Sequence, residues 1–404
     1  MRVMVMSWEY PPHITGGMGE HVKQIVPALL ALDPGLAVDV VTPTFFGETA
    51  VDKSPQLTIH RVAVERPRRN EFFDDVQRAN RVLAAAADDI YRESGDVDFI
   101  HVHDWLTGPA SLVLNQTFGV PILTTVHATE RGRYRGSLHS EMSRAIDSVE
   151  CELAQRSGQI IACSKVMAHE VCNYFGIGCH KLSVIPNGVD ATRFRPLRES
   201  DHTEFRLQYA EPDECIIFNV GRLVYEKGAD LVIEAAPAIL TRFPKTKFVI
   251  GGRGPLLPGL EQRSAELGLE DRVILAGYLS DLDRDQLYVI ADCCVFPSRY
   301  EPFGIVALES MAAGTPVVAS GVGGLGTVVT HEVTGLTIFS ENVDSLAWGI
   351  IQTLGDPIAA ERRANRALDA VETCLAWPVI AGMTLELYHD FSKAGEQLER
   401  AADL

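Results

Sequence analysis

The chain has 404 residues, which is too long for one ordinary hydrophobic core and indicates two large domains. Hydrophobic residues make up 46% of it and charged residues 22%, as in soluble globular proteins rather than in disordered or membrane-spanning ones. The formal net charge of −18 argues against nucleic acid and against an anionic membrane surface as the main partner. A local group of Arg and Lys side chains can still bind a small anionic ligand.

The N-terminal segment Met1–Met6 is too short an apolar run for a signal peptide, and we predict that it forms the first strand. No run approaches the length of a membrane span, so we expect no integral membrane segment. The eight cysteines form no Cys-x-x-Cys pair and show no metal-ligand spacing. We therefore expect reduced thiols in a cytoplasmic protein.

Short apolar runs alternate with helical segments along the chain, and repeated βα units predict parallel sheets with helices on both faces. The first series of predicted strands is Val3–Ser7, Val38–Thr42, Thr58–Val62, Phe99–His103, Ile122–Val126, Ile160–Cys163 and Leu182–Ile185. The second series is Ile216–Val220, Lys247–Gly251, Val273–Ala276, Cys294–Pro297, Val317–Ala319 and Gly335–Ile338. Predicted helices between them include Met18–Ala31, Val76–Glu93, Gly228–Leu240 and Leu282–Ala291.

The break between the two series falls at the turn-forming segment Pro186–Asp190, which the polar stretch Arg195–Thr203 follows. We predict two doubly wound, Rossmann-like α/β domains, residues 1–190 and 191–376, facing each other across a cleft. In such folds a ligand binds at the carboxyl ends of the strands.

A glycine-rich loop, Thr15 to Gly19, follows the first predicted strand and opens a helix. The paired glycines Gly16 and Gly17 let the backbone approach a ligand closely, and a helix N-terminus favours an anion. The loop lacks the spaced G-x-G-x-x-G pattern of a dinucleotide-binding site.

The predicted strand Phe99–His103 carries His101 and His103 on one face. A metal would need a third ligand, and none appears nearby in the sequence, so we predict no metal. Asp104 comes next and allows two interpretations. It caps the following helix, or it faces a sugar.

His127 lies at the end of the fifth predicted strand, on the side where α/β sheets bind ligands. The segment Arg131–Gly136 follows and carries three arginines around Tyr134. Three interpretations stay open for this segment. It binds an anionic acceptor, it offers Tyr134 for stacking on a sugar ring, or it is a mobile surface loop.

Two cations, Arg222 and Lys227, straddle the turn after the first strand of the second domain. The planar fork of Arg and the point charge of Lys can converge on one diphosphate. Asp283 and Asp285 form an Asp-x-Asp pattern, but they fall in the acidic first turn of a predicted helix, so we do not interpret them as metal ligands.

The most informative segment, Tyr300–Glu309, links a buried strand to a short helix that ends at Gly314. Glu301 falls in the loop and Glu309 about two turns into the helix. We expect Phe303, Gly304, Ile305 and Val306 to bind the substrate, because the backbone N–H groups around Gly304 to Val306 are predicted to be free donors at the helix start, where a phosphate can bind.

This segment resembles the E-x7-E motif of the retaining glycosyltransferases with the GT-B fold, the large family that includes glycogen synthase, sucrose synthase and many mannosyltransferases. The resemblance extends to the glycine loop, to the His103-Asp104-Trp105 triplet, to His127 and to the Arg222/Lys227 pair. Bacterial glycogen synthases carry Lys-Thr-Gly-Gly where this chain has Ile14-Thr15-Gly16-Gly17, so the lysine is absent. The chain is more similar to the short glycogen synthases.

The resemblance implies that residues 1–190 form the acceptor-side domain and residues 191–376 the nucleotide-sugar donor domain. It also implies that the C-terminal helix, within 377–404, packs back on the first domain. Glu301 and His127 would contact the donor sugar, Glu309 the ribose, and Arg222 with Lys227 the departing diphosphate. Asp104 and Tyr134 would line the sugar and acceptor sites, and the amides near Gly16, Gly17 and Gly304 would bind donor oxygens.

The implied reaction is transfer of glucose from ADP-glucose or UDP-glucose to an α-1,4-glucan with retention, without a metal or another cofactor. Alternatives are a mannosyl- or sucrose-type transferase with another donor or acceptor, a nucleotide-sugar epimerase of the same fold, and a non-catalytic sugar-binding protein. A retaining glycosidase is a poor fit. Its two carboxyl groups lie about 5 Å apart, whereas eight residues of helix span roughly 12 Å. The oligomeric state stays open.

Overall fold

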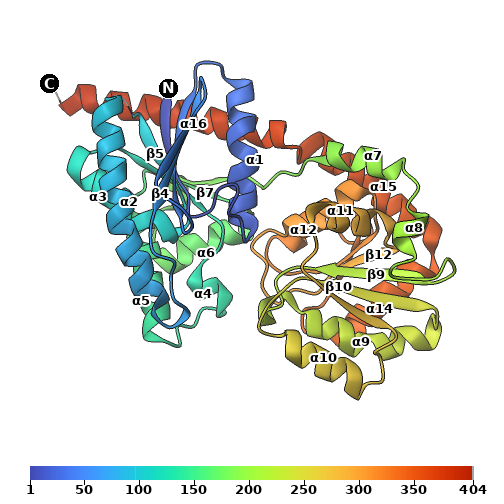
Figure 1. The fold of residues 1–404 in the computed structure, drawn as a ribbon. Coiled ribbons are helices and arrows are strands. Elements are labelled where there is room, and N and C mark those ends of the chain that lie inside the picture. The colour runs from blue at the N-terminus through green and yellow to red at the C-terminus, as the bar shows by residue number, and fades with distance from the viewer. Residues whose placement is uncertain (96, 403–404) are drawn as a thin grey trace. The chain divides into compact units, whose positions relative to one another are not determined.

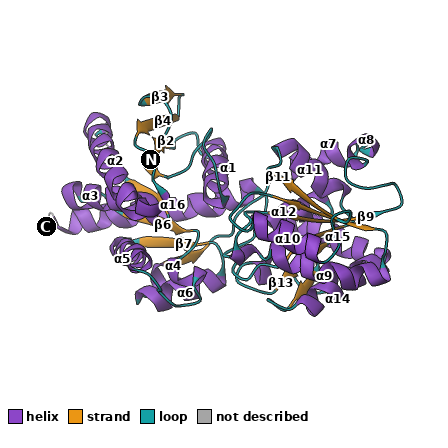
Figure 2. Cartoon of the chain, turned by 60° about the horizontal axis from the view of Figure 1, so that its bottom comes forward, coloured by secondary structure: helices purple, strands orange, loops and turns teal. Residues whose placement is uncertain are grey.

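The computed structural model describes residues 1–95 and 97–402, which fold into two compact units. Unit 1 comprises Met1–Asn187 together with the C-terminal helix α16 (Trp377–Ala402), and unit 2 comprises Gly188–Ala376. Each unit is a largely parallel sheet flanked by helices, which confirms the predicted fold class of two doubly wound α/β domains (Figures 1 and 2).

The sheet of unit 1 has the strand order β3-β4-β2-β1-β5-β6-β7-β8. Its pairs are parallel except for β3 against β4, which is antiparallel. The strands are β1 (Arg2–Met6), β2 (Ala37–Thr44), β3 (Ala50–Lys53), β4 (Leu57–Ala63), β5 (Phe99–His103), β6 (Ile122–Val126), β7 (Gln159–Ala162) and β8 (Leu182–Val184). Sequence analysis missed β3, because all four of its residues are exposed and it carries no apolar face.

The helices of unit 1 surround this sheet in Figures 1 and 2. They are α1 (Gly17–Leu32), α2 (Phe72–Ser94), α3 (Gly108–Phe118), α4 (Glu130–Arg133), α5 (Glu141–Arg156), α6 (Lys165–Phe175) and α16, with the short 3-10 helices η1 (Arg69–Glu71), η2 (Trp105–Thr107) and η3 (Cys179–Lys181). Helix α16 packs against α1, so the last helix of the chain returns to the unit in which the chain begins.

The sheet of unit 2 is parallel throughout, with the order β11-β10-β9-β12-β13-β14. Its strands are β9 (Cys215–Val220), β10 (Thr246–Gly251), β11 (Val273–Gly277), β12 (Cys293–Phe296), β13 (Val317–Ser320) and β14 (Leu336–Ile338). Its helices are α7 (Arg195–Arg198), α8 (Thr203–Arg206), α9 (Ala229–Arg242), α10 (Leu257–Glu266), α11 (Asp281–Ile290), α12 (Ile305–Ala313), α13 (Leu325–Val328), α14 (Val343–Gly355) and α15 (Pro357–Cys374), with 3-10 helices η4 (Ala191–Phe194) and η5 (Tyr225–Lys227).

Apolar packing between sheet and helices holds each unit together. Strand β12 shows why these runs form central strands, since all four of its residues are buried and apolar on both faces. In unit 1, Leu83 of α2 and Leu112 of α3 belong to one buried cluster with Ile100 of β5. Full burial of a side chain of this kind stabilises the fold by about 1.5–3 kcal/mol.

Both sheets reverse their strand order at a defined point, and ligands of doubly wound folds bind in the crevice outside that point. In unit 1 the reversal lies between β1 and β5, and in unit 2 between β9 and β12. The glycine loop follows β1 and Asp104 follows β5, whereas the Arg222/Lys227 turn follows β9 and Glu301 follows β12. Each unit therefore presents predicted site residues at its own reversal point.

Within the described residues, no helix combines the length and the apolar character needed to cross a bilayer.

Candidate active site

The loops after β9 and β12 meet through an ion pair in unit 2. Lys227 Nζ, in η5, donates to Glu301 Oε2 at 2.6 Å, and the Ser298 hydroxyl donates to the same oxygen at 3.3 Å. The backbone carbonyl of Glu226 accepts from the N–H groups of Arg299 and Tyr300, which ties the two loops together. Two residues that lie far apart in the sequence, Lys227 and Glu301, therefore share one location.

Gly228 allows this close approach of the two loops. Its φ is +71°, and a Cβ at this position would collide with the carbonyl oxygen of Pro297. Arg222 lies at the other end of the turn with an exposed side chain. Among the residues that the structure describes, no carboxylate forms an ion pair with Arg222, so its guanidinium is available to an anionic ligand.

The N-terminus of α12 lies directly after Glu301. Gly304 precedes the helix with a φ of +101°, and no side chain caps this end. The first N–H groups of an uncapped helix are donors without an intrahelical partner, and the helix dipole makes this end favourable for an anion. The nine-residue helix α12 thus places free amides next to the Lys227–Glu301 pair. Phe303 is buried in the protein core, so its side chain packs there.

Glu309 points toward α11 and the segment η4, and it is only 5% exposed. Its Oε1 accepts from Arg193 Nη2 at 2.6 Å, and its Oε2 accepts from the Tyr288 hydroxyl at 2.9 Å. Arg193 Nε also lies 3.2 Å from an Asp285 oxygen. A carboxylate has about four lone-pair sites, so these contacts leave room for a ribose hydroxyl, but Glu309 is also part of a buried ion network.

The glycine loop of unit 1 holds an internal carboxylate that sequence analysis did not identify. Glu9 Oε2 accepts from the backbone N–H groups of Thr15 and Gly16, each at 3.0 Å, and Glu9 Oε1 accepts from the Thr15 hydroxyl. The Gly16 amide therefore has a partner within the protein. A Cβ at Gly16 would meet nothing within 4 Å, so the space beside that residue is open to a ligand.

Asp104 and His127 are joined through the backbone. Asp104 Oδ1 accepts from the His127 N–H at 2.6 Å, and Asp104 also accepts from the backbone of Ala128. The Asp104 side chain does not cap the 3-10 helix that follows it, so of the two interpretations the capping one is wrong. Its φ of +58° is uncommon for a residue other than glycine, and burial raises the pKa of its carboxyl to about 6.

Four histidines gather beneath this loop. His103 Nδ1 lies 3.1 Å from His127 Nε2, and the centroids of the His101 and His103 rings are 4.2 Å apart, with the rings tilted by 38°. The His21 ring from α1 contacts His127 edge-on. Burial lowers the pKa of His127 to about 3, and it lowers the pKa values of His21, His101 and His103 well below their usual range. These rings are therefore neutral at physiological pH.

One group of three side chains has the composition of a metal site. Ligand atoms of His21, His103 and His127 lie within 4.8 Å of one another. The sequence indicated no third ligand for His101 and His103, whereas the fold brings His21 and His127 next to His103. Two of these ligand atoms, His103 Nδ1 and His127 Nε2, are nevertheless engaged with each other. A hydrogen bond between His103 and His127 needs a proton between the two nitrogens, whereas a metal would need both lone pairs directed at the ion. The geometry therefore fits a hydrogen-bonded cluster better than a metal centre.

The arginine-rich segment after His127 forms the short helix α4 (Glu130–Arg133) and contacts α5. Thr129 caps the short helix α4, and its side chain accepts from the Gly132 N–H. Arg131 forms two hydrogen bonds to Asp147, at 2.6 and 2.7 Å. Tyr134 is 45% exposed, with its ring edge-on to His139. Arg131 is therefore not available to bind an anionic acceptor, whereas the ring of Tyr134 is accessible to a sugar.

Asp283 and Asp285 do not form a joint acidic site. Ser280 caps α11 by accepting from the Asp283 N–H and donates its hydroxyl to Asp283 Oδ2, while Asp285 pairs with Arg193 and Arg284. Burial raises the pKa of Asp285 to about 6. Each carboxylate thus has a separate structural role.

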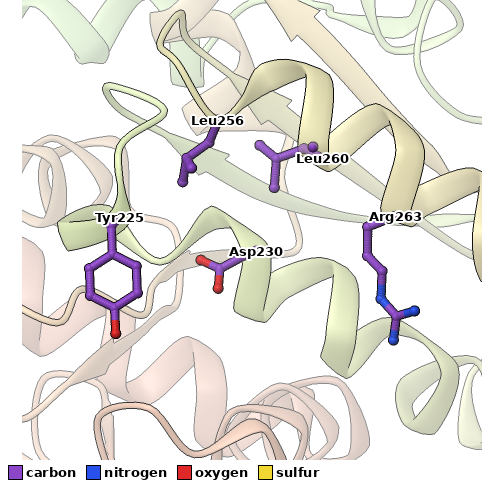
Figure 3. Close-up of a pocket in the computed structure, with 6 residues that line it drawn as sticks. Tyr225, Asp230, Leu256, Leu260 and Arg263 are labelled. Carbon is purple, nitrogen blue, oxygen red and sulfur yellow. The ribbon is translucent and has the colours of Figure 1, made fainter.

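A small cavity of about 230 Å³ lies on unit 2, between η5, α9 and α10 (Figure 3). Its lining residues are Tyr225, Asp230, Leu256, Gly259, Leu260 and Arg263. Asp230 is already bound by Arg299, and Arg263 by Glu234, so these charged side chains have partners. None of the predicted site residues lines this cavity, and we do not regard it as the active site.

Sequence analysis missed several residues that shape the site. Glu9 and His21 carry no motif of their own, and Arg193 reaches Glu309 across 116 positions of sequence. The loop at Gly323 and Gly324 supports Glu301, since the Gly324 N–H donates to the Glu301 carbonyl and a Cβ at Gly323 would collide with it. The glycine-rich run Gly321–Gly326 was the available signal for this loop.

Two families of known proteins match the chain, one over each unit. Residues 15–193 match Glycosyltransferase Family 4, and residues 201–369 match Glycosyl transferases group 1. A glycogen synthase of Mycobacterium tuberculosis is 34% identical over 96% of this chain and 94% of its own. A D-inositol 3-phosphate glycosyltransferase of Kribbella flavida is 31% identical over 92% of this chain and 90% of its own.

Solved structures show the same fold. A sucrose-phosphate synthase from Thermosynechococcus elongatus superimposes with a TM-score of 0.81 and 26% sequence identity, covering 97% of this chain and 99% of that chain.

Proposed function

Because this chain belongs to the family 4 glycosyltransferases of the GT-B fold and is a nucleotide-sugar-dependent hexosyltransferase, we propose that it elongates an α-1,4-glucan. In this proposal it transfers glucose from ADP-glucose or UDP-glucose to the end of the glucan, with retention at the anomeric carbon. The similarity to a glycogen synthase along nearly the whole chain supports this acceptor. We expect the reaction to occur in the cytoplasm.

The observation that best supports a role in donor activation is the Lys227–Glu301 pair beside the uncapped start of α12. When the bond between sugar and diphosphate breaks, negative charge develops on the leaving phosphate. Lys227, the unpaired Arg222 and the amides at Gly304, Ile305 and Val306 are the groups that stabilise this charge in our proposal. Glu301 balances Lys227 before the donor arrives, and its carboxylate then accepts hydrogen bonds from sugar hydroxyls.

Unit 1 supplies neutral groups in the same proposal. His127 binds the donor sugar, and the backbone at Gly17 binds its phosphate oxygens in the open space beside Gly16, whose own N–H is held by Glu9. Asp104 holds the loop that carries His127. Tyr134 offers an exposed ring against which a pyranose of the acceptor stacks. As the bond to the diphosphate breaks, the acceptor hydroxyl attacks the anomeric carbon from the same face and gives its proton to the departing phosphate oxygen, which gives retention without a covalent enzyme intermediate.

A second candidate acceptor is D-inositol 3-phosphate, which the name of a 31% identical relative suggests. An anionic acceptor of this kind would need cations near the acceptor site. Arg131 of α4 is already paired with Asp147, so this helix supports an anionic acceptor less well than it supports a neutral glucan.

A panel assay separates these candidates. The purified protein is incubated with ADP-glucose, UDP-glucose or GDP-mannose, each with glycogen, with D-inositol 3-phosphate or with no acceptor, and nucleotide release is measured. The proposal predicts release that depends on a glucose donor and on glycogen. Release with inositol phosphate alone, or with a mannose donor alone, would replace the proposed acceptor or donor.

A further inference from the structure

The hydrogen bond between His103 and His127 determines where His127 carries its proton. The two nitrogens, His103 Nδ1 and His127 Nε2, are 3.1 Å apart, and the rings are inclined by only 20°. Both rings are neutral, because burial lowers both pKa values. A neutral imidazole has one N–H and one bare nitrogen, so one of the two histidines donates and the other accepts.

The opposite nitrogen of His103 decides between these two arrangements. His103 is fully buried, and its Nε2 has no hydrogen-bond partner. If His127 donated, His103 would accept at Nδ1 and carry its own proton on Nε2, as a buried N–H without an acceptor. Such orphaned buried donors are rare because they destabilise the fold. If His103 donates, only a bare lone pair is left at Nε2.

The two neighbouring histidines, His101 and His21, make no hydrogen bond that would determine the proton position on His103. His101 uses both ring nitrogens elsewhere, with the Tyr388 hydroxyl at 2.6 Å and Thr125 Oγ1 at 2.7 Å. His21 Nδ1 is bound to Asn187 Oδ1 at 2.8 Å. Neither ring is hydrogen-bonded to His103, so the proton between His103 and His127 has a single pair of sites.

We propose that His103 is a positioning residue that fixes His127 as the Nδ1–H tautomer. His127 Nε2 then accepts from His103 Nδ1–H, and the half-buried ring keeps an N–H at Nδ1. His127 therefore meets its ligand as a neutral hydrogen-bond donor and cannot act there as a general base. The identity of the ligand oxygen, a hydroxyl of the donor sugar, rests on the proposed function, whereas the tautomer does not.

The first test uses the unaltered protein and requires no activity. With 15N-labelled histidine, long-range proton–nitrogen spectra distinguish a protonated Nδ1 from a protonated Nε2, and loss of one signal set in His127→Gln assigns His127 among the 12 histidines. We expect protonated Nδ1 and bare Nε2 at His127. The reverse pattern would overturn the inference and leave the proposed function standing.

Matched variants then test the role of His103. His103→Leu removes the donor, whereas His103→Asn keeps an amide N–H close to the Nδ1 position. We expect His103→Leu to lose the single-tautomer spectrum and to lower kcat roughly tenfold, as for one lost hydrogen bond of about 1.4 kcal/mol, with an unchanged inhibition constant for the free nucleotide. His103→Asn should restore both the spectrum and most of kcat.

His101→Leu is the matched control, since His101 is buried on the same strand face but makes no hydrogen bond to His127. It should leave the tautomer of His127 unchanged. An unchanged tautomer in His103→Leu would show that His103 does not set it. If the tautomer is as inferred but His127→Ala keeps full turnover, the proposed sugar contact of His127 fails and the inference about the tautomer stands.

Discussion

The two units differ in the charge of the side chains at the corresponding edges of their sheets. In unit 2 the predicted site residues are charged and paired, as in Lys227 with Glu301 and Arg193 with Glu309. In unit 1 the polar groups below the loop are neutral histidines, and Asp104 is bound by backbone N–H groups rather than by a cation. Charged groups suit a diphosphate and neutral donors suit sugar hydroxyls, so the comparison suggests a division of labour between the units.

The largest effect should follow from removing the cation of unit 2. Lys227→Ala leaves charge on the leaving diphosphate unmatched, and we expect kcat to fall on the order of 10²-fold or more. Lys245→Ala is the matched control, because Lys245 is a surface lysine of the same unit, paired with Asp213. Turnover within a few-fold of normal in Lys227→Ala would remove this residue from the mechanism.

The two glutamates of unit 2 should differ in which kinetic constant they affect. Glu301→Ala should mainly lower kcat, since its contact orients the reacting sugar. Glu309→Ala should mainly weaken nucleotide binding, by roughly tenfold for a loss of about 1.4 kcal/mol, because a ribose contact is alike in ground and transition states. Steady-state kinetics with the free nucleotide as competitive inhibitor measures both effects.

The alternative to a ribose contact is that Glu309 only stabilises the fold, through its buried hydrogen bonds to Arg193 and Tyr288. Loss of this carboxylate leaves the Tyr288 hydroxyl without its partner and leaves Arg193 paired with Asp285 alone, at a cost of about 1–3 kcal/mol in the free energy of unfolding. A lower Tm for Glu309→Ala together with an unchanged nucleotide inhibition constant would assign Glu309 to structure alone.

A smaller effect concerns a buried neutral group of unit 1. Burial raises the pKa of Glu150 to about 8, so the folded state holds a proton that the unfolded chain loses near pH 4.5. The stabilisation that Glu150 contributes is complete below pH 4.5 and is lost as the pH rises through about 8. The buried histidines, whose pKa values are lowered, make the protein more stable as the pH rises, but only below their usual pKa of about 6.5. Tm should therefore fall between pH 6.5 and 8, and Glu150→Gln should flatten that slope. An equal slope in the variant would contradict the assignment.

The smallest expected effect is that of a chelator. Arg and Lys stand where a metal-dependent enzyme would place carboxylates, and His127 is hydrogen-bonded to His103. Turnover should be the same with and without EDTA. Loss of activity in EDTA and its recovery with manganese or zinc would require a reassessment of Asp283, Asp285 and the histidine group.

Local sequence patterns predicted most of the fold and the loops that carry the site. The strands of both sheets are apolar runs, and Glu301 and Lys227 belong to motifs at the ends of such runs. The exposed strand β3 and the short helix α4 were missed, because neither has an apolar periodicity.

Contacts between distant segments could not be predicted in the same way. The approach of His21 to His127 depends on α1 packing over the sheet, and Arg193 finds Glu309 only when η4 packs against α12. The position of Glu9 in the glycine loop likewise follows from the path of the chain after β1. The sequence indicated candidate residues, whereas tertiary packing determined which of them are paired, exposed or neutral.

The division of labour between the units is tested most directly by one measurement, the inhibition constant of the free nucleoside diphosphate for Lys227→Ala and for His127→Ala, alongside the unaltered protein. The account predicts that Lys227→Ala raises this constant by tenfold or more, about 1.4 kcal/mol of lost phosphate binding. It predicts that His127→Ala leaves the constant within a factor of two or so while lowering kcat, because a neutral contact to the sugar is absent from the free nucleotide. Equal weakening of nucleotide binding in both variants, or weakening only in His127→Ala, would contradict it.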